Sequence, residues 1–286
     1  MSDRRPFFWL DVFTEQPLEG NGLAVVLEAD SVSAETMLAF AREVGLSEST
    51  FVQTADQSGA DYRNRIWTVS DEIPFAGHPS LGTAVAVAID RGMTSANFVQ
   101  QTQVGLQEVE VENQDGQWYA AIRQPLAEFG QTWSAEQTAA ILGLSAEQMD
   151  PHLSAQLVST GLPALLLPVA DREALASCRP DFDALHRIES RPALNTYAFV
   201  HERGSKTVHA RCFAQDLAGV EDPATGSAAG PLVAYLQDCL DISSIVVRQG
   251  EDMGRPSRLD ASMVDGQPRV GGNVVLLSEG VVHLPD

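Results

Sequence analysis

Lysine is almost absent from this 286-residue sequence, in which Lys206 is the only one. Basic residues number 18 and acidic residues 39, so the formal net charge at pH 7 is −21. Such a field repels the phosphate backbone of nucleic acids and the surface of anionic membranes, and no basic patch along the sequence offsets it. We therefore expect no nucleic-acid partner and no membrane partner, and we expect an anionic substrate to need hydrogen-bond donors focused at one site.

Long apolar runs are lacking as well. The richest stretch, residues 162–170, holds two prolines and falls well short of the roughly 18–20 residues that a membrane-spanning helix needs. The first residues, Met1-Ser-Asp-Arg-Arg-Pro, have neither the apolar core nor the small-residue cleavage site of a secretory signal peptide. These features predict a cytoplasmic protein without a membrane span.

Cysteine is scarce, and no C-x-x-C pair exists among Cys178, Cys212 and Cys239. This spacing argues against a zinc knuckle and against a dithiol redox centre, so we expect buried structural thiols in a reducing compartment. The histidines outside one loop discussed below are scattered without the spacing of a helical metal site: His152, His186, His201, His209 and His283. The sequence therefore predicts no bound metal.

The residues that are present have the composition of a folded protein. The apolar fraction is 44% and the charged fraction 20%, which excludes disorder as the main state. The length suits two domains of roughly 100–200 residues each. Short segments rich in β-branched and aromatic residues predict strands at 7–14, 23–27, 46–53, 62–69, 97–102, 105–112, 118–123, 155–159, 163–168, 194–201 and 206–213. The last forty residues predict several short strands, with turns at 264–266 and 271–273.

Helix signals are fewer. Ser33 and Gly45 predict the two ends of one helix. Two Ser-x-x-Gln sequences match a capping box, at 134–137 for a helix of about 134–142 and at 145–148 for a shorter one. Between these helices and the preceding strands, Pro125 and Gly130 interrupt the pattern, which predicts a domain boundary near 125–132.

Two further helices, at 79–89 and 227–236, are apolar or small on every face, which is typical of a helix buried on all sides. Pro231 is tolerable in the second helix if it lies near the first turn. We interpret the two halves as an internal duplication, each half a set of strands wrapped around one central helix. The predicted fold class is α+β. The elements do not alternate regularly and no G-x-G-x-x-G or Walker loop is present, which argues against a doubly wound nucleotide-binding fold.

Each predicted buried helix follows a small loop that contains glycine: Pro74-Phe-Ala-Gly-His-Pro-Ser80 and Glu221-Asp-Pro-Ala-Thr-Gly-Ser227. A helix start offers free amide groups and a partial positive charge, and glycine lets a ligand approach the backbone closely. Two such starts facing one cleft would hold a small carboxylate despite the negative field of the protein. The side chains that the loops offer to such a ligand are His78, Asp222 and Ser227.

Several segments follow one another in order: Asp11-Val-Phe-Thr14, Gly20-Asn21 with Ala24-Val-Val26, Leu46-Ser-Glu-Ser-Thr-Phe-Val52, Phe75-Ala-Gly-His-Pro-Ser-Leu-Gly82 and Glu221-Asp-Pro-Ala-Thr-Gly-Ser-Ala228. On these segments the sequence resembles the PhzF family of phenazine-biosynthesis-like isomerases. The resemblance implies the diaminopimelate-epimerase-like fold, with two similar domains, each a β-barrel-like sheet around a central helix, and an active site between them. It also implies a homodimer that needs no cofactor. The domains would be residues 1–125, completed by a C-terminal strand at about 275–286, and residues 126–274.

The resemblance also implies roles for individual residues. Glu48 matches the family's acid/base residue. The residues that match its substrate contacts are His78, Asp222 and Ser227, with the glycines beside them, Gly77 and Gly226. In the phenazine pathway the family's reaction moves a proton within a dihydro-hydroxyanthranilate. One carboxyl group can do this if its pKa lies near the working pH, so we expect Glu48 to be shielded and its pKa to be raised.

Each of these residues also has a plainer interpretation. Glu48 alone would more often be a solvated carboxylate between a helix and a strand. Asp222 and His78 each precede a proline, so each could be a helix N-cap with proline at the first helical position, and Ser227 could cap its own helix. Asn21, between two glycines, suits a tight turn better than a ligand contact.

Three functions remain open on the sequence. The leading hypothesis is a cofactor-independent isomerase that moves a proton on a small carboxylate-bearing substrate, with Glu48 as acid/base. The first alternative is a non-catalytic protein that binds a small carboxylate on the same scaffold. The second is a racemase or epimerase with non-cysteine bases, because the related racemases use a cysteine at each helix start and this chain has none in either loop. The sequence does not name the substrate.

Overall fold

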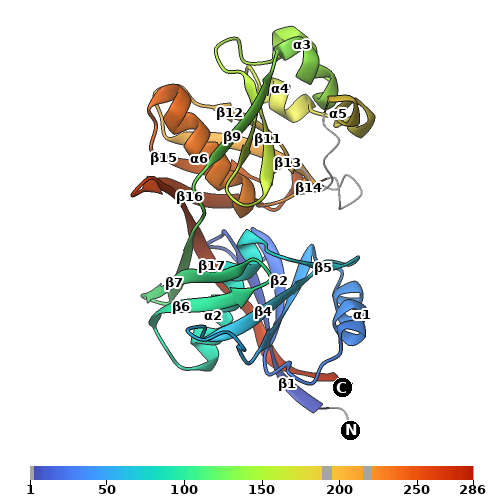
Figure 1. Cartoon of the computed structure of the whole chain (residues 1–286), viewed down its shortest axis with the longest axis vertical. Coiled ribbons are helices and arrows are strands. Elements are labelled where there is room, and N and C mark those ends of the chain that lie inside the picture. The colour runs from blue at the N-terminus through green and yellow to red at the C-terminus, as the bar shows by residue number, and fades with distance from the viewer. Residues whose placement is uncertain (1–2, 189–194, 215–220, 286) are drawn as a thin grey trace. The chain divides into compact units, whose positions relative to one another are not determined.

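Both ends of the chain meet in one sheet. The computed structural model describes residues 3–188, 195–214 and 221–285 (Figure 1). These residues form two compact units, unit 1 with residues 1–123 and 271–286 and unit 2 with residues 124–270. In unit 1 the first strand, β1 (Asp3–Val12), pairs antiparallel with the last, β17 (Gln267–Leu284). Strands dominate and helices are interspersed, which confirms the predicted α+β class.

The strands of unit 1 close into a barrel. Beside β1 and β17 it contains β2 (Asn21–Val26), β3 (Glu48–Gln53), β4 (Tyr62–Trp67), β6 (Ser95–Thr102), β7 (Gly105–Gln114) and β8 (Gln117–Arg123). The pairing runs β1–β2–β3–β4–β6–β7–β8–β17 and returns to β1. The β2–β3 and β4–β6 pairs are parallel. Between them, the short β5 (Glu72–Ile73) pairs with β4.

A single helix, α2 (Gly77–Asp90), fills the barrel. It contacts strands around the whole ring: β1, β2, β3, β4, β6, β7 and β8. Every residue from Gly77 to Ala88 is buried, which confirms the prediction of a helix without a polar face. Small residues on α2 let the strands of the barrel approach the helix closely. A Cβ atom added to Gly82 would lie 2.6 Å from Leu23 Cδ2 on β2.

Unit 2 repeats this order of pairing. Its strands are β9 (Glu128–Trp133), β10 (Ala155–Ser159), β11 (Pro163–Pro168), β12 (Asn195–His201), β13 (Thr207–Ala214), β14 (Glu221–Asp222), β15 (Ser244–Gln249) and β16 (Ser257–Val264). The pairs β11–β12 and β13–β15 are parallel, as β2–β3 and β4–β6 are, and β14 pairs with β13 as β5 pairs with β4. The central helix is α6 (Gly226–Leu240), which contacts β10, β11, β15 and β16. The pairing order therefore confirms the predicted internal duplication.

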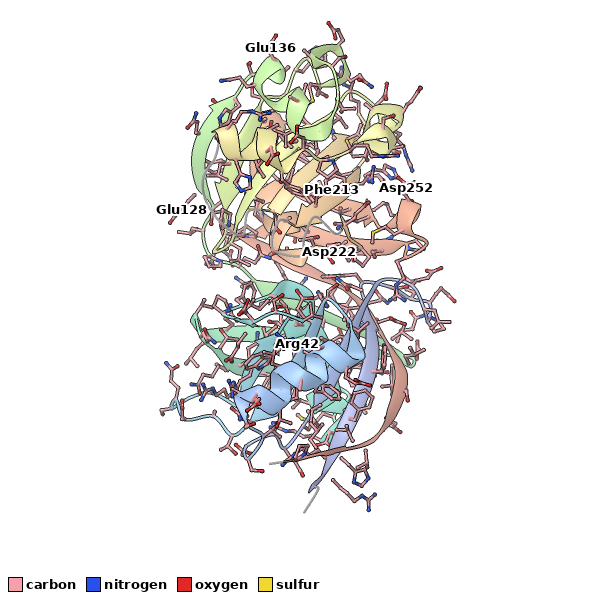
Figure 2. All side chains as sticks on the ribbon, turned by 90° about the vertical axis from the view of Figure 1, so that its right-hand side faces the viewer. Arg42, Glu128, Glu136, Phe213, Asp222 and Asp252 are labelled. Atoms are coloured by element: carbon pink, nitrogen blue, oxygen red, sulfur yellow. The ribbon has the colours of Figure 1, made fainter. Side chains whose placement is uncertain are left out.

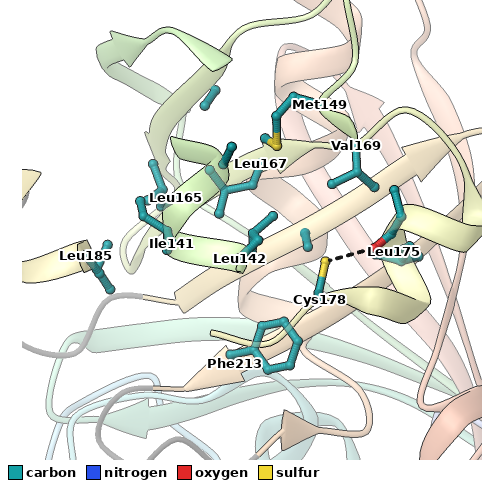
Figure 3. Close-up of a cluster of buried hydrophobic side chains, with 14 of the residues drawn as sticks. Ile141, Leu142, Met149, Leu165, Leu167, Val169, Leu175, Cys178, Leu185 and Phe213 are labelled. Atoms are coloured by element: carbon teal, nitrogen blue, oxygen red, sulfur yellow. Dashed lines mark hydrogen bonds between the residues drawn. The ribbon is translucent and has the colours of Figure 1, made fainter. Parts of the chain in front are cut away.

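The remaining helices cover the sheets from outside. In unit 1, α1 (Ala34–Val44) connects the parallel strands β2 and β3, with Ser33 and Gly45 as its caps, as predicted. In unit 2, α4 (Arg172–Ser177) and α5 (Phe182–Ile188) make the corresponding connection. Their apolar side chains join a buried cluster that includes Leu142, Leu167 and Phe213 (Figure 3). Neither α4 nor α5 was predicted from the sequence.

Buried Cys178 follows α4 and belongs to the same cluster, and its thiol donates to the Ala174 carbonyl at 3.4 Å (Figure 3). Burial raises the pKa of Cys178 to about 11, so the group stays a thiol and acts as a small apolar residue. Cys212 is buried too, but Cys239 is exposed near the end of α6, so the expectation of three buried thiols is wrong for that residue.

Three other expectations need correction. Residues 271–273 lie inside the long strand β17 and form no turn. Pro231 is the sixth residue of α6 and lies in its second turn, beyond the amides that lack helical acceptors. The predicted helix at 134–142 is one α-helical turn, α3 (Ala135–Thr138), followed by the 3₁₀ turn η1 (Ala139–Leu142). The second capping box begins only the 3₁₀ turn η2 (Ala146–Gln148), and a further 3₁₀ turn, η3 (Glu251–Met253), follows β15.

Among the described residues no helix combines the length and hydropathy of a membrane span.

Candidate active site

Each unit holds the strand before its glycine loop with the same ion pair. In unit 1 the Arg65 guanidinium donates twice to the Glu72 carboxylate, at 2.8 and 2.7 Å. In unit 2 Arg211 donates to Glu221 with the same two distances. Burial opposes the charged form of Glu72, but the Arg65 hydrogen bond and charge outweigh it and lower the pKa of that carboxyl. These bidentate pairs fix the short strands β5 and β14, from which the loops depart.

An aromatic ring supports each arginine. The Arg65 guanidinium lies 5.4 Å from the centroid of the Trp67 ring, and the Arg211 guanidinium lies 4.9 Å from that of Phe213. Phe213 pairs with Glu221 across β13 and β14, and the next residue of β14 is Asp222 (Figure 2). The strand ends that precede both loops are therefore held by paired charges and by stacking.

In unit 1 the loop brings His78 to Glu48. Glu48 is the first residue of β3, and His78 is the second residue of α2. Their side chains approach with Glu48 Oε2 3.5 Å from His78 Nε2, and only 14% of the Glu48 side chain is exposed. On the other side of the ring, Asn21 Nδ2 lies 3.3 Å from His78 Nδ1. A carboxyl group, an imidazole and a carboxamide are thus collected at the start of the buried helix.

The His78 ring is neutral in this setting. Burial lowers its pKa to about 3, and a hydrogen bond with the Gly22 backbone acts in the opposite direction without overcoming burial. At neutral pH the Glu48–His78 contact therefore joins a carboxyl group to an uncharged ring. Such a ring can donate or accept a hydrogen bond but supplies no positive charge to a substrate.

Unit 2 has different side chains in the corresponding places. Asn195 is the first residue of β12, as Glu48 is of β3, and Ser227 is the second residue of α6, as His78 is of α2. Asn195 Nδ2 donates to Ser227 Oγ at 3.3 Å. Asp222, at the end of β14, accepts a hydrogen bond at Oδ2 from the Thr225 hydroxyl at 2.6 Å. The second loop therefore offers an amide, a hydroxyl and one carboxylate.

The residues at the two helix starts test whether His78, Asp222 and Ser227 are helix N-caps. The N-caps are Ala76 for α2 and Thr225 for α6, and neither makes a side-chain capping bond. His78, Asp222 and Ser227 are therefore not helix caps, contrary to that interpretation of the sequence. Gly77 and Gly226 are the first helical residues, so their amides are among those that lack an acceptor within the helix.

Sequence reasoning missed two residues of this arrangement. Asn21 was assigned to a turn, yet it is the first residue of β2, is 2% exposed and contacts His78. Asn195 was included in a predicted strand without further notice. Glu-x-Pro-x-x-Gly occurs at both 72–77 and 221–226 and aligns the two loops, but Asn195 lies two residues farther from its loop than Glu48 does, so this repeat alone does not point to Asn195. Among the described residues no cluster of histidine, cysteine and carboxylate side chains could hold a metal ion.

Known proteins are similar to this chain in sequence and fold over almost their whole length. A family model described as phenazine biosynthesis-like protein matches residues 10–280. A trans-2,3-dihydro-3-hydroxyanthranilate isomerase of Pseudomonas aeruginosa is 34% identical over 96% of this chain and 98% of its own. An uncharacterized isomerase of Mesorhizobium japonicum is 34% identical over 98% of this chain and 99% of its own. A solved structure of a predicted epimerase from Pseudomonas aeruginosa superposes with a TM-score of 0.84 and 36% identity, covering 97% of this chain and 99% of that chain. The chain therefore belongs to the phenazine biosynthesis-like (PhzF) family, and it is an isomerase.

Proposed function

We propose that this isomerase moves a proton between carbon atoms of a small carboxylate-bearing substrate, with Glu48 as the acid/base group and without a cofactor. The observation that carries the proposal is the mostly buried Glu48 carboxyl 3.5 Å from a neutral histidine at a helix start. The carboxyl is shielded from water over most of its surface, as an acid/base group at carbon requires. A group of that kind can accept a proton from one carbon and return it to another.

The differences between the two units favour one acid/base group over two. Unit 2 holds Asn195 where unit 1 holds Glu48, and an amide neither takes up nor releases a proton at ordinary pH. The second residues of the two central helices are His78 and Ser227, so the thiols of a two-cysteine racemase are missing from both places. A proton shift by Glu48 alone needs no partner base of the same kind.

The other site residues suit a substrate that carries a carboxylate. We propose that the backbone amides at Gly77 and Gly226 and the Ser227 hydroxyl receive that carboxylate, because helix starts attract anions. His78, as a neutral hydrogen-bonding group, and Asp222, as an acceptor, would hold and orient the remaining polar groups of the substrate. In this proposal one substrate is bound by both loops. A dihydro-hydroxyanthranilate, on which the Pseudomonas aeruginosa relative acts by its name, is the first compound to test.

Deuterium exchange tests this function directly. The protein is incubated in D₂O with a dihydro-hydroxyanthranilate and a panel of small cyclic or amino-acid-like carboxylates, and NMR follows deuterium uptake and product formation. We expect the wild type to exchange deuterium into one compound. The exchange rate should fall at least 100-fold in Glu48→Gln, which keeps the shape of the side chain but neither takes up nor releases a proton at ordinary pH. Glu43→Gln is the matched control, because Glu43 is exposed on α1. Full turnover by Glu48→Gln would refute the assignment.

The same samples separate the alternatives. A ligand that raises the unfolding temperature without any exchange in D₂O indicates a binding protein. Inversion of a stereocentre, seen by chiral chromatography of the product, indicates a racemase with non-cysteine bases. Homodimer formation stays a prediction, and sedimentation equilibrium of the purified protein measures it.

A further inference from the structure

A buried glutamine of a distant strand holds the loop of unit 2 in place. We propose that Gln249 is a positioning residue, which sets the direction of the Asp222 carboxylate and the start of α6 for the substrate. This inference rests on the proposed function for Asp222. Gln249 is the last residue of β15 and is 1% exposed. Gln249 lies 24 residues after Thr225, beyond the end of α6, so the contact between them is tertiary.

The side-chain amide of Gln249 uses its full hydrogen-bonding capacity on this task. Its Oε1 accepts from the Tyr197 hydroxyl at 2.9 Å and from the Thr225 backbone amide at 3.3 Å. Its Nε2 donates to the Asp222 carbonyl at 2.7 Å and to the Thr225 hydroxyl oxygen at 2.9 Å. Three of these four bonds end on the loop, so Gln249 is a tertiary anchor of it.

The chemistry of the partners fixes which way the amide points. The Thr225 backbone amide can only donate and the Asp222 carbonyl can only accept, so the oxygen and nitrogen of Gln249 cannot be exchanged. The Thr225 hydroxyl accepts from Nε2, and its own hydrogen is therefore left for Asp222 Oδ2, 2.6 Å away. Gln249 thus orients a hydroxyl, and the hydroxyl orients the carboxylate.

This arrangement replaces a missing cap. Thr225 is the N-cap of α6, but its side chain makes no capping bond because it is directed to Asp222. A second buried glutamine, Gln124, donates to the Gly226 carbonyl at 2.9 Å and accepts from the Thr160 hydroxyl at 2.6 Å. The loop and the start of α6 therefore depend on two glutamines that are distant in the chain, Gln124 and Gln249. Binding groups need to be held to within about 0.5 Å, and such tertiary hydrogen bonds supply that precision.

Two substitutions separate positioning from mere stability. Gln249→Met keeps the length of the side chain and removes all four hydrogen bonds. Gln249→Glu keeps the shape but places an oxygen against the Asp222 carbonyl, which only the protonated carboxyl can satisfy as a donor. Gln100→Met is the matched control, since Gln100 is a fully buried glutamine of β6 that contacts Asn64 and Gln107 and neither loop.

The kinetic test compares these variants with the wild type on the substrate found by deuterium exchange. We expect kcat/KM to fall 10- to 100-fold in Gln249→Met and to stay within threefold in Gln100→Met at a similar loss of thermal stability. In Gln249→Glu, the ratio of its kcat/KM to that of the wild type should rise as pH falls from 8 to 5.5, because protonation restores one donor. Wild-type kinetics in both Gln249 variants, or an equal loss in Gln100→Met, would overturn the inference.

A second readout does not depend on turnover. Amide hydrogen exchange by NMR should show at least tenfold faster exchange of the Thr225 amide in Gln249→Met, with protection of the β6 amides unchanged. A wild-type protein that moves no proton on any compound would defeat the proposed function, while the Thr225 exchange would still decide whether Gln249 holds the loop. An unchanged exchange rate of the Thr225 amide in Gln249→Met would refute the positioning role of Gln249 even in an active enzyme.

Discussion

Acid should destabilise this protein in part through His78, and replacing that residue should remove that part of the sensitivity. Burial lowers the pKa of His78 to about 3, whereas the ordinary value is 6.5. The unfolded chain therefore binds this proton at a higher pH than the folded chain does. The contribution of the neutral ring to stability is complete above pH 6.5, and it is lost progressively as pH falls from 6.5 towards 3.

The size of the effect follows from the width of that window. Each pH unit below the unfolded pKa costs about 1.4 kcal/mol of folding free energy for one such group. Between pH 7.5 and 4.5 the wild type should lose about 3 kcal/mol through His78, which is a large share of the roughly 5–15 kcal/mol typical of a folded protein. The His78→Gln variant has no titrating ring, so the same acid step should cost it about 3 kcal/mol less.

Urea unfolding of both proteins between pH 7.5 and 4.5 measures this difference, because carboxylates shared by the two proteins contribute alike. NMR titration of the His78 ring gives the folded pKa directly. Glu48→Gln is one control. An ionised Glu48 carboxylate 3.5 Å from His78 would stabilise the charged form of the His78 ring, and this variant removes that effect. His152→Gln is the other control, because His152 is exposed. A His78 midpoint above pH 5, or parallel acid dependence in wild type and His78→Gln, would refute the reasoning.

Three further substitutions test how the site is supported, each by urea unfolding. Gly230→Ala on α6 would bring a Cβ atom to 1.8 Å from Gln124 Oε1, so we expect a loss of about 1–3 kcal/mol, partly restored by adding Gln124→Ala; an additive double variant would contradict this. Gly82→Ala would bring a Cβ atom to 2.6 Å from Leu23 Cδ2, with a similar expected loss that Leu23→Ala should reduce. Arg211→Lys replaces a bidentate fork by a point charge, and we expect a loss of about 1–2 kcal/mol, whereas Arg258→Lys on a half-exposed pair should change little.

The sequence predicted best those elements whose cause is local. Ser33 accepts a hydrogen bond from the Thr36 amide and Gly45 adopts a left-handed conformation with φ 68°, so both ends of α1 are set by residues at the ends themselves. The two central helices were predictable for a similar reason, because small and apolar residues on all faces leave no face for water.

Glycine was one source of error, because a glycine that permits a turn and a glycine that permits two strands to approach look alike in a sequence. Residues 271–273 contain two glycines and suggested a turn, but they continue β17. A Cβ atom at Gly271 would lie 2.7 Å from the Ala120 carbonyl oxygen of β8, so this glycine permits two strands to approach closely. The neighbour that demands it lies about 150 residues earlier, out of reach of any local pattern.

The site was predicted only where a residue belongs to a recognisable string. Glu48, His78, Asp222 and Ser227 lie in such strings, and the structure brings Glu48 to His78. Asn21 lies in a string as well, but its contact with His78 spans 57 positions and depends on the pairing of β2 inside the barrel. The helices α4 and α5 were missed because neither is longer than two turns, too short for a periodic pattern to stand out.

What the two units share and where they differ follow a physical logic. The Arg–Glu pairs, the stacked rings, the parallel crossovers and the central helix recur in both, because each unit must close its strands around one helix and present the helix start. The side chains at that start diverge, with Glu48 and His78 in one unit and Asn195 and Ser227 in the other. Donors that hold a carboxylate can be supplied by amides and hydroxyls, but a proton can be taken from carbon only by a group that titrates. If Glu48 both takes and returns the proton, the two events occur on one face of the substrate. A duplicated scaffold that could have carried a base in each unit would then serve a shift along one face.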